Sequence, residues 1–182
     1  MSANLYHPQP LLTKEGSLLE KIKKIKYLLL DVDGVLTNGA IFINENGEES
    51  LGFSIYDGMG IALFKKAGFD VGFVSGRKSM AIAKRASALG VSDCYLGASD
   101  KGAIYNEILI KHGLKECEVA FVGDDLIDLP VLRRVGLSVA VPNAVDAVLK
   151  EVDWVTARKG GEGAIRELID AILSASEKSP AI

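Results

Sequence analysis

The sequence has little cysteine and no long apolar run, and each shortage excludes a class of protein. Two cysteines in 182 residues are too few for a disulfide framework. No segment approaches the ~20 consecutive apolar residues that a membrane span requires, and residues 1–17 hold no stretch apolar enough for a signal peptide. We therefore expect a cytoplasmic protein without a membrane partner, in which Cys94 and Cys117 are buried, reduced thiols.

The chain also lacks an excess of positive charge. Its formal net charge is -3, whereas proteins that bind nucleic acid usually carry a strong basic excess, so we expect no nucleic-acid partner. The one basic run, "EKIKKIK" at 20–26, has isoleucine at 22 and 25, which is typical of a helix with one solvated face. With 48% hydrophobic and 25% charged residues, the composition and length suit one globular domain with a well-filled core.

Apolar runs alternate with helix-like segments along most of the chain. This alternation predicts an α/β fold, a Rossmann-like three-layer sandwich whose mostly parallel sheet is covered by helices on both faces. The predicted strands are 26–32, 71–75, 94–97, 119–123, 138–141 and 153–156. The predicted helices are 58–67, 79–89, 101–112, 126–135, 144–150 and 163–173. Four glycines are expected to cap helices in the left-handed conformation, namely Gly68, Gly90, Gly113 and Gly136.

We expect one domain at 17–174, preceded by a flexible leader at 1–16 and followed by a polar tail at 175–182. Its first helix should start at the capping box "SLLE", that is at Ser17. Residues 39–55 break the α/β pattern, because they alternate around Asn46-Gly47 in the way typical of a β-hairpin with a tight turn. This small hairpin is inserted directly after the end of the first strand.

Carboxylates, a hydroxyl and an ammonium group fall where predicted strands end or helices begin. Because ligands of open parallel sheets bind beyond the carboxyl ends of the strands, we expect these groups to meet at one edge. Oxygen-only ligands without histidine or cysteine suit Mg²⁺. The hydroxyl, two backbone amides and the ammonium group would bind a phosphoryl group. The residues are Asp31, Asp33, Ser75, the amides of Gly76 and Arg77, Lys101, Asp124 and Asp125.

Each of these residues alone also has a structural interpretation. An aspartate after a strand is a common turn former or helix cap, "SGR" (75–77) fits a βα turn, and Lys101 fits a solvated first-turn lysine. Their joint position at the strand ends favours the functional interpretation. The His112-Gly113 pair is interpreted as a helix end, without chemistry.

Four motifs resemble, in order, those of the haloacid dehalogenase-like phosphatase superfamily. They are "DVDGVLTNG" (31–39), "VSGR" (74–77), "DK" (100–101) and "GDDLIDLP" (123–130). Three further segments are similar to its 3-deoxy-D-manno-octulosonate 8-phosphate phosphatase subfamily, namely "DGMGI" (57–61), "GLSVAVPNA" (136–144) and "GGEGAIREL" (160–168). The resemblance spans about residues 18–173 and implies that the hairpin stands in place of a full cap domain.

The resemblance implies a reaction through an aspartyl-phosphate, with Asp31 as nucleophile and Asp33 as general acid and then general base. These roles need opposite protonation states, so the metal and Lys101 would keep Asp31 ionised while the pKa of Asp33 is raised. Mg²⁺ would be bound by the Asp31 carboxylate, the Asp33 backbone carbonyl and Asp124. Gly34 would permit the close backbone turn toward the metal.

The resemblance also implies roles for groups around this centre. Asp125 and Asp128 would orient waters on the metal. The hairpins would pack together in a homotetramer, in which a neighbouring subunit completes each site. The segment "KGGEG" (159–163) would reach its own or a neighbour's active site, or else is simply a loop before the last helix. Candidates to bind a substrate carboxylate are Arg77, Arg158 and Lys159.

Two departures from the subfamily pattern bear on the substrate: Asn38 stands where aspartate is common, and Glu162 where arginine is common. We predict a Mg²⁺-dependent phosphatase acting on 3-deoxy-D-manno-octulosonate 8-phosphate in lipopolysaccharide precursor synthesis. One alternative keeps the mechanism and takes a nine-carbon keto-sugar acid 9-phosphate. A distant alternative is a phospho-accepting receiver-like signalling domain, whose acceptor lies on the third strand. A non-catalytic scaffold would not need both Asp31 and Asp33.

Overall fold

A computed structural model describes residues 14–176 of the chain. The first helix, α1 (Lys14–Ile22), begins three residues before the predicted start at Ser17. The expected flexible leader therefore falls on residues outside the described range, apart from 14–16, which are helical. The expected polar tail likewise lies outside it from residue 177 on.

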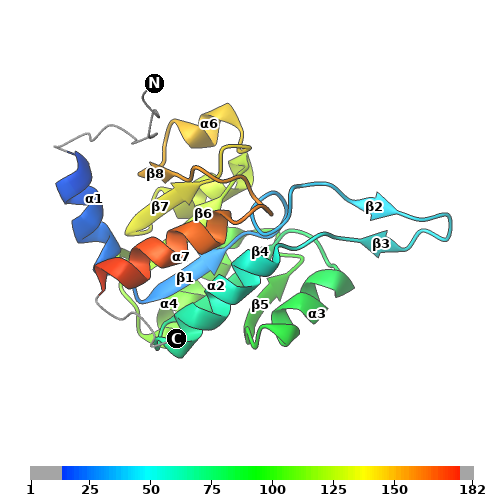
Figure 1. The fold of residues 1–182 in the computed structure, drawn as a ribbon, viewed down its shortest axis with the longest axis horizontal. Coiled ribbons are helices and arrows are strands. Elements are labelled where there is room, and N and C mark those ends of the chain that lie inside the picture. Colours follow the sequence, from blue (N-terminus) through cyan, green and yellow to red (C-terminus); the bar gives the residue numbers. More distant parts are fainter. Residues whose placement is uncertain (1–13, 177–182) are drawn as a thin grey trace, which may run out of the picture.

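The core of the molecule is a six-stranded parallel sheet, as predicted. Its spatial order is β5-β4-β1-β6-β7-β8, and every neighbouring pair is parallel. The central strand β1 is wholly buried, because helices cover both of its faces (Figure 1). The strands are β1 (Tyr27–Leu30), β4 (Asp70–Ser75), β5 (Asp93–Leu96), β6 (Val119–Gly123), β7 (Leu137–Ala140) and β8 (Trp154–Val155).

Helices flank the sheet on two sides and complete the predicted three layers. In Figure 1, α2 (Ile55–Lys66) and α7 (Ala164–Ala175) pack together in front of β1, and α4 (Lys101–His112) lies behind it. The helix expected at 126–135 is divided into a 3-10 turn, η2 (Leu126–Asp128), and a short α5 (Leu129–Leu132). The remaining helical segments are α3 (Met80–Ala88), η1 (Glu116–Glu118) and α6 (Asp146–Leu149).

The predicted hairpin is present and projects from the body of the molecule (Figure 1). Its antiparallel strands are short, β2 (Phe42–Ile43) and β3 (Glu49–Ser50). The turn between them contains Asn46-Gly47, and Gly47 has a φ of 78°, which a residue with a side chain rarely adopts. The hairpin leaves the sheet directly after the first strand and its turn, so its base lies beside the carboxyl ends of the strands.

Three of the four glycine caps are confirmed and one is wrong. Gly68, Gly90 and Gly113 have φ values of 86°, 65° and 62°. Gly136 does not have a positive φ; a Cβ there would instead lie 2.4 Å from the carbonyl oxygen of Cys117. Glycine is needed at 136 because two backbone segments approach closely, which a capping pattern does not reveal.

The prediction for the two cysteines is also corrected. Cys94 is half-buried in β5, but Cys117 is exposed, because it lies in the surface turn η1. Neither forms a disulfide. Over residues 14–176, no helix is both long and apolar enough to cross a membrane.

Candidate active site

The turn after β1 is built around one threonine and one glycine. The buried hydroxyl of Thr37 accepts hydrogen bonds from the backbone amides of Gly34 and Gly39, each at 3.2 Å. Gly34 has a φ of 86°, and a Cβ there would lie 1.9 Å from Oδ2 of Asp124. The turn can therefore close against the end of β6 only with glycine at 34, as the sequence predicted.

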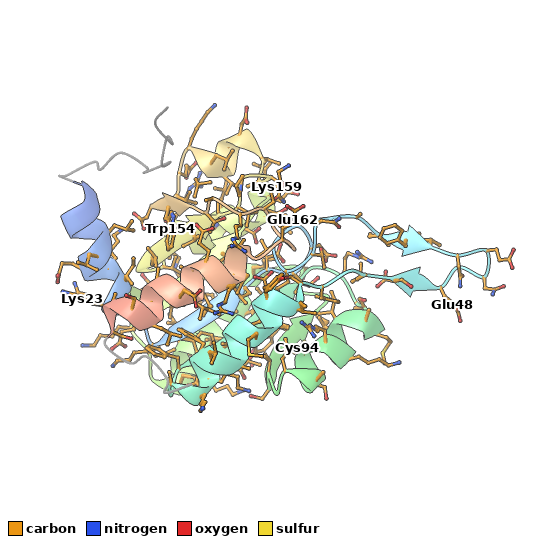
Figure 2. The ribbon with its side chains drawn as sticks, in the orientation of Figure 1. Lys23, Glu48, Cys94, Trp154, Lys159 and Glu162 are labelled. Atoms are coloured by element: carbon orange, nitrogen blue, oxygen red, sulfur yellow. The ribbon has the colours of Figure 1, made fainter. Side chains whose placement is uncertain are left out.

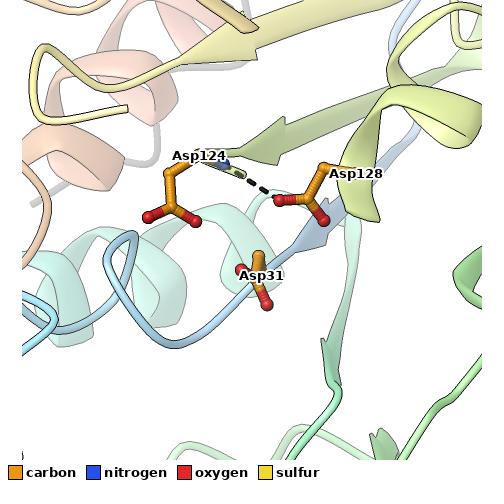
Figure 3. Close-up of side chains that lie close together, drawn as sticks. All are labelled: Asp31, Asp124 and Asp128. Atoms are coloured by element: carbon orange, nitrogen blue, oxygen red, sulfur yellow. Dashed lines mark hydrogen bonds between the residues drawn. The ribbon is translucent and has the colours of Figure 1, made fainter. Parts of the chain in front are cut away.

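Three aspartates from two strand ends converge beside this turn (Figure 3). One carboxylate oxygen from each of Asp31, Asp124 and Asp128 lies within 4.8 Å of the others. Asp128 is held in place because its Oδ2 accepts from the amides of Asp124 (3.0 Å) and Asp125 (3.2 Å). The Asp125 carboxylate is exposed and caps η2 by accepting from the amide of Leu126 at 2.7 Å.

Lys101 is the buried counter-charge of this cluster. Its Nζ lies 2.8 Å from Oδ1 of Asp31 and 2.6 Å from Oδ1 of Asp128, and the lysine side chain is only 2% exposed. Asp100 positions it by capping α4, since its carboxylate accepts from the amide of Ala103 at 3.0 Å. Burial alone would lower the pKa of Lys101, but the Asp31 and Asp128 carboxylates outweigh burial and raise it.

One ammonium group does not balance three clustered carboxylates. Burial, with the Asp128 charge next, raises the pKa of Asp31 well above its usual range, although Lys101 opposes the shift. The same two causes raise the pKa of Asp124 to about 6. Lys101 thus offsets only part of the effect of burial and of the neighbouring carboxylates on the pKa of Asp31. An oxygen-only set with surplus negative charge fits a hard divalent cation such as Mg²⁺.

Asp33 lies on the other side of the turn and contacts the end of β4. Its Oδ2 accepts from the hydroxyl of Ser75 at 3.1 Å, and its Oδ1 lies 2.9 Å from Nη1 of Arg77. The amide of Arg77 donates to the Ser75 hydroxyl at 3.0 Å. A phosphoryl group bound by Ser75 and this amide would therefore replace bonds that they make to each other and to Asp33.

Arg77 also connects the site to the hairpin. Its Nη2 contacts the carboxylate of Glu49 on β3, and the hydroxyl of Ser79 donates to the same carboxylate. The sequence singled out Arg77 but not Glu49. A single acidic residue in a hairpin does not indicate which basic residue it will contact, and here the partner lies 28 residues further along the chain.

The glycine-rich loop, residues 159–163, packs against the turn of its own chain. The amide of Gly161 donates to the carbonyl of Val35 at 3.0 Å, and a Cβ on Gly160 would lie 1.7 Å from the carbonyl oxygen of Gly34. The loop is held at its far end by the buried carboxylate of Asp57, which accepts from the amides of Gly163 (3.3 Å) and Arg166 (2.8 Å).

The segment was expected either to reach its own or a neighbour's active site or to be simply a loop before the last helix. It does reach the turn after β1 of its own chain, near the base of the hairpin. Lys159 and Glu162 lie on that side of the molecule (Figure 2). Both are exposed, as are Arg158 and Asn38, and the Asn38 side chain accepts from the amide of Ala40 at 3.0 Å. Their part in binding a sugar stays a prediction.

A cavity of about 300 Å³ opens over this cluster. Asp31, Asp33, Arg77, Lys101 and Asp124 line it, so the residues predicted from four separate segments meet in one place. A larger cavity of about 850 Å³ lies at the amino ends of the strands and is bordered by lysines and His112. Two of these lysines pair with glutamates, Lys23 with Glu20 and Lys26 with Glu118. Within the described residues, the only carboxylate cluster spaced for a metal is the one at the opposite edge.

Comparison with known proteins agrees with this geometry. The sequence profile of haloacid dehalogenase-like hydrolases matches residues 97–168. The 3-deoxy-D-manno-octulosonate 8-phosphate phosphatase KdsC of Escherichia coli (strain K12) is 41% identical over 163 residues, which cover 90% of this chain and 87% of that protein. The chain belongs to the KdsC family of haloacid dehalogenase-like hydrolases.

Solved structures of the KdsC family have the same fold. The enzyme from Yersinia pestis is 41% identical with a TM-score of 0.88, and the match covers 89% of this chain and 88% of that one. The enzyme from Moraxella catarrhalis, solved in complex with a magnesium ion, a phosphate ion and KDO, is 34% identical with a TM-score of 0.87. That match covers 89% of this chain and 93% of the other.

Two residues of this KdsC-family site were not anticipated. The carboxylate of Glu49 accepts from Arg77, and the side chain of Asn143 bridges the turn after β1 and the glycine-rich loop. The sequence did hold a signal for Asn143, because it follows β7 at the same edge of the sheet as the aspartates. It lies outside the four motifs, and its two partners are 109 and 17 residues away along the chain.

Proposed function

We propose that this chain is a Mg²⁺-dependent phosphatase that hydrolyses 3-deoxy-D-manno-octulosonate 8-phosphate to the free sugar acid and phosphate. The observation that carries the proposal is the buried contact of Asp31 with Lys101 beside Asp124, at the strand edge that carries the motifs resembling those of haloacid dehalogenase-like phosphatases. The product feeds lipopolysaccharide precursor synthesis. The relatives are phosphatases, so the receiver-like alternative is set aside.

In the first step, an Oδ atom of Asp31 attacks phosphorus, and the bond from phosphorus to the sugar oxygen breaks as the aspartyl-phosphate forms. Asp33 gives its proton to the departing sugar oxygen. In the second step Asp33 takes a proton from water, whose oxygen attacks phosphorus and releases Asp31. Ser75 and Arg77 hold the Asp33 carboxylate at 3.1 and 2.9 Å, beside the nucleophile's turn.

Charge neutralisation is the other requirement of phosphoryl transfer. Lys101 places its ammonium 2.8 Å from the nucleophilic carboxylate and is fixed there by Asp128. The Asp31 and Asp124 carboxylates and the Asp33 carbonyl would hold Mg²⁺, with Asp128 beside them. When bound, the cation neutralises carboxylate and phosphoryl oxygens. The backbone amides of Gly76 and Arg77 would complete the phosphoryl site.

We further propose a homotetramer in which hairpins pack together and a neighbour completes each site. The hairpin exposes Phe42 (64%) and Ile43 (70%), and nearby helix starts expose Tyr56 (60%) and Met80 (73%). An apolar surface of this kind marks a site of association.

We also propose a cytoplasmic location. Fractionation of cells against cytoplasmic and periplasmic marker enzymes tests that location.

The function is tested by phosphate release from a panel of phosphate esters with and without Mg²⁺. The panel holds the eight-carbon and nine-carbon keto-sugar acid phosphates beside simple hexose phosphates. Asp31→Asn removes the nucleophile. Asp70→Asn is the matched control, because Asp70 is an exposed aspartate at the opposite, amino end of β4.

Preference for the eight-carbon ester, lost in Asp31→Asn and kept in Asp70→Asn, supports the proposal in full. Preference for the nine-carbon ester keeps the mechanism and replaces the substrate. If the folded protein releases no phosphate from any ester in the presence of Mg²⁺, the proposal is wrong.

A further inference from the structure

The loop between β7 and α6, residues 141–145, touches both chain segments that carry the clustered aspartates. The side-chain Nδ2 of Asn143 donates to the carbonyl of Gly34 at 2.8 Å. The backbone amide of Val145 donates to the carbonyl of Asp124 at 2.9 Å. One short loop thus holds the turn after β1 and the end of β6 at the same time.

Asn143 uses both ends of its side-chain amide in this arrangement. While Nδ2 donates to Gly34, Oδ1 accepts from the backbone amide of Gly160 at 2.8 Å. The three residues are in close contact, since a Cβ on Gly160 would collide with the Gly34 carbonyl. The side-chain amide of Asn143 is therefore held in one orientation, because the turn after β1 bonds its Nδ2 and the glycine-rich loop bonds its Oδ1.

Gly34 needs such external support because glycine restricts its own backbone less than any other residue. The peptide group before Gly34 contains the Asp33 carbonyl, and its amide donates to the hydroxyl of Thr37 at 3.2 Å. The peptide group after Gly34 is held by Asn143. Thr37 and Asn143 together set the two peptide planes around this glycine, and with them the direction of the Asp33 carbonyl.

We propose that Asn143 is a positioning residue for the metal site: it holds the Gly34 turn against Asp124 so that the Asp33 carbonyl and the two carboxylates point at one cation. This proposal for Asn143 depends on the proposed function only because that function identifies the cation as Mg²⁺. Asn143 lies on the surface and outside the core, so its loss should weaken metal binding much more than it weakens the fold.

The test measures metal binding without substrate. Mn²⁺, a paramagnetic substitute for Mg²⁺, is titrated into the protein and the free ion is counted by electron paramagnetic resonance. Asn143→Leu keeps the approximate size of the side chain and removes both bonds. We expect its Mn²⁺ dissociation constant to rise about tenfold, the factor that one hydrogen bond of ordinary strength accounts for. At saturating Mg²⁺, kcat should recover most of its loss.

Hydrogen exchange followed by mass spectrometry provides a second readout that depends on neither metal nor turnover. In Asn143→Leu, the Gly160 amide loses its acceptor, so the peptide covering residues 158–163 should exchange faster. Asn106→Leu is the matched control, because Asn106 accepts one bond, from Arg134 at 2.8 Å, on the exposed face of α4. It should change neither the Mn²⁺ affinity nor exchange in that peptide.

Unchanged Mn²⁺ affinity in folded Asn143→Leu overturns the proposal, as does a wild-type protein that binds no Mn²⁺. If Asn143→Leu does not fold, Asn143→Ser replaces it, because the shorter side chain cannot span Gly34 and Gly160 together. A wild-type protein that binds Mn²⁺ but cleaves no sugar phosphate refutes the proposed function alone. The effect of Asn143 on metal affinity would still decide this proposal.

Discussion

At the scale of single residues, the most consequential contact is the buried ammonium of Lys101 between Asp31 and Asp128. Replacing Lys101 with Met leaves two buried carboxylates without their counter-charge. Breaking a buried pair in this way typically costs about 3–5 kcal/mol, and in a chain of this size that lowers the melting temperature by roughly 10 °C. We expect that shift in metal-free protein and a loss of activity of about 10³-fold, measured by thermal melts and phosphate release.

The matched control for this prediction is Lys111→Met. Lys111 also pairs with an aspartate, Asp93, but its side chain is 51% exposed, so solvent can replace the pair. Its loss should move the melting temperature much less and leave turnover unchanged. If Lys101→Met melts like the wild-type protein, the buried ion pair is not the stabilising contact inferred here.

Asp93 provides a pH-dependent contribution to stability far from the active site. Its carboxylate is 3% exposed and accepts from Tyr27, Lys111 and His112. Burial alone would raise the pKa of Asp93, but these donors outweigh it and lower the pKa. A lowered pKa stabilises the fold at pH values above the unfolded pKa near 4, and the contribution is lost as pH falls through the folded pKa.

Asp93→Asn should therefore lower the free energy of unfolding at pH 7 by about 2 kcal/mol, the usual contribution of hydrogen bonds to a charged group. Urea titrations at pH 7 and at pH 3.5 measure this difference, which should shrink at the lower pH because the unfolded chain then takes up a proton at Asp93 more readily than the folded protein does. The exposed Asp70→Asn serves as control. A difference that stays constant between the two pH values would contradict the assignment of the effect to this carboxylate.

At the scale of elements, the glycine-rich loop packs closely against the turn after β1. Gly160→Ala would place a Cβ 1.7 Å from the Gly34 carbonyl oxygen, and backbone atoms cannot turn aside as a flexible side chain can. The turn must shift by an ångström or so, and a displacement of that size can lower turnover about 10²-fold. Steady-state kinetics of Gly160→Ala beside Gly52→Ala checks this, since a Cβ on Gly52 meets nothing within 4 Å. Equal kcat values would contradict it.

The elements were largely predictable from the sequence, and the reasons are physical. Near-continuous apolar runs such as "YLLL" in β1 require cover on both faces, and glycine ends helices at Gly68, Gly90 and Gly113 through their positive φ. Gly136 was misinterpreted because close backbone contact and helix capping select the same residue type. The start of α1 was placed three residues late, since a capping box can also occur inside a helix.

The candidate site was predictable where residues follow strand ends and not where they meet through side chains. The fold rule brought Asp31, Asp124 and Lys101 to one edge, and their distances confirm that they meet. Asp128 was expected to orient waters on the metal, which stays a prediction; η2 places its buried carboxylate beside Asp31 and Asp124, where it contacts Lys101. Glu49 has no local pattern that indicates its contact with Arg77, and the position of Asn143 after β7 did not identify its partners Gly34 and Gly160, which are distant along the chain.

At the scale of the whole molecule, contacts within a single chain do not explain the exposed apolar residues of the hairpin. Its strand β2 exposes the apolar side chains of Phe42 and Ile43, although a hairpin surrounded only by solvent would not need them. On its other strand, the carboxylate of Glu49 accepts a hydrogen bond from Arg77, which lines the cavity over the aspartates. If hairpins pack together, the substitution Phe42→Asp places a charge in that contact and should dissociate the assembly. Sedimentation velocity should then shift from about four times the 19.4 kDa chain mass toward a single chain.

Activity distinguishes simple dissociation from completion of the site by a neighbour. If a second subunit closes the cavity, KM for the sugar-acid phosphate should rise about tenfold in Phe42→Asp while metal binding is unchanged, because Asp31 and Asp124 lie within one chain. Ile110→Asp is the control, since Ile110 is 83% exposed on α4, away from the hairpin. A wild-type protein that sediments as a single chain with full activity would refute the shared site, because the cavity over the aspartates would then suffice alone.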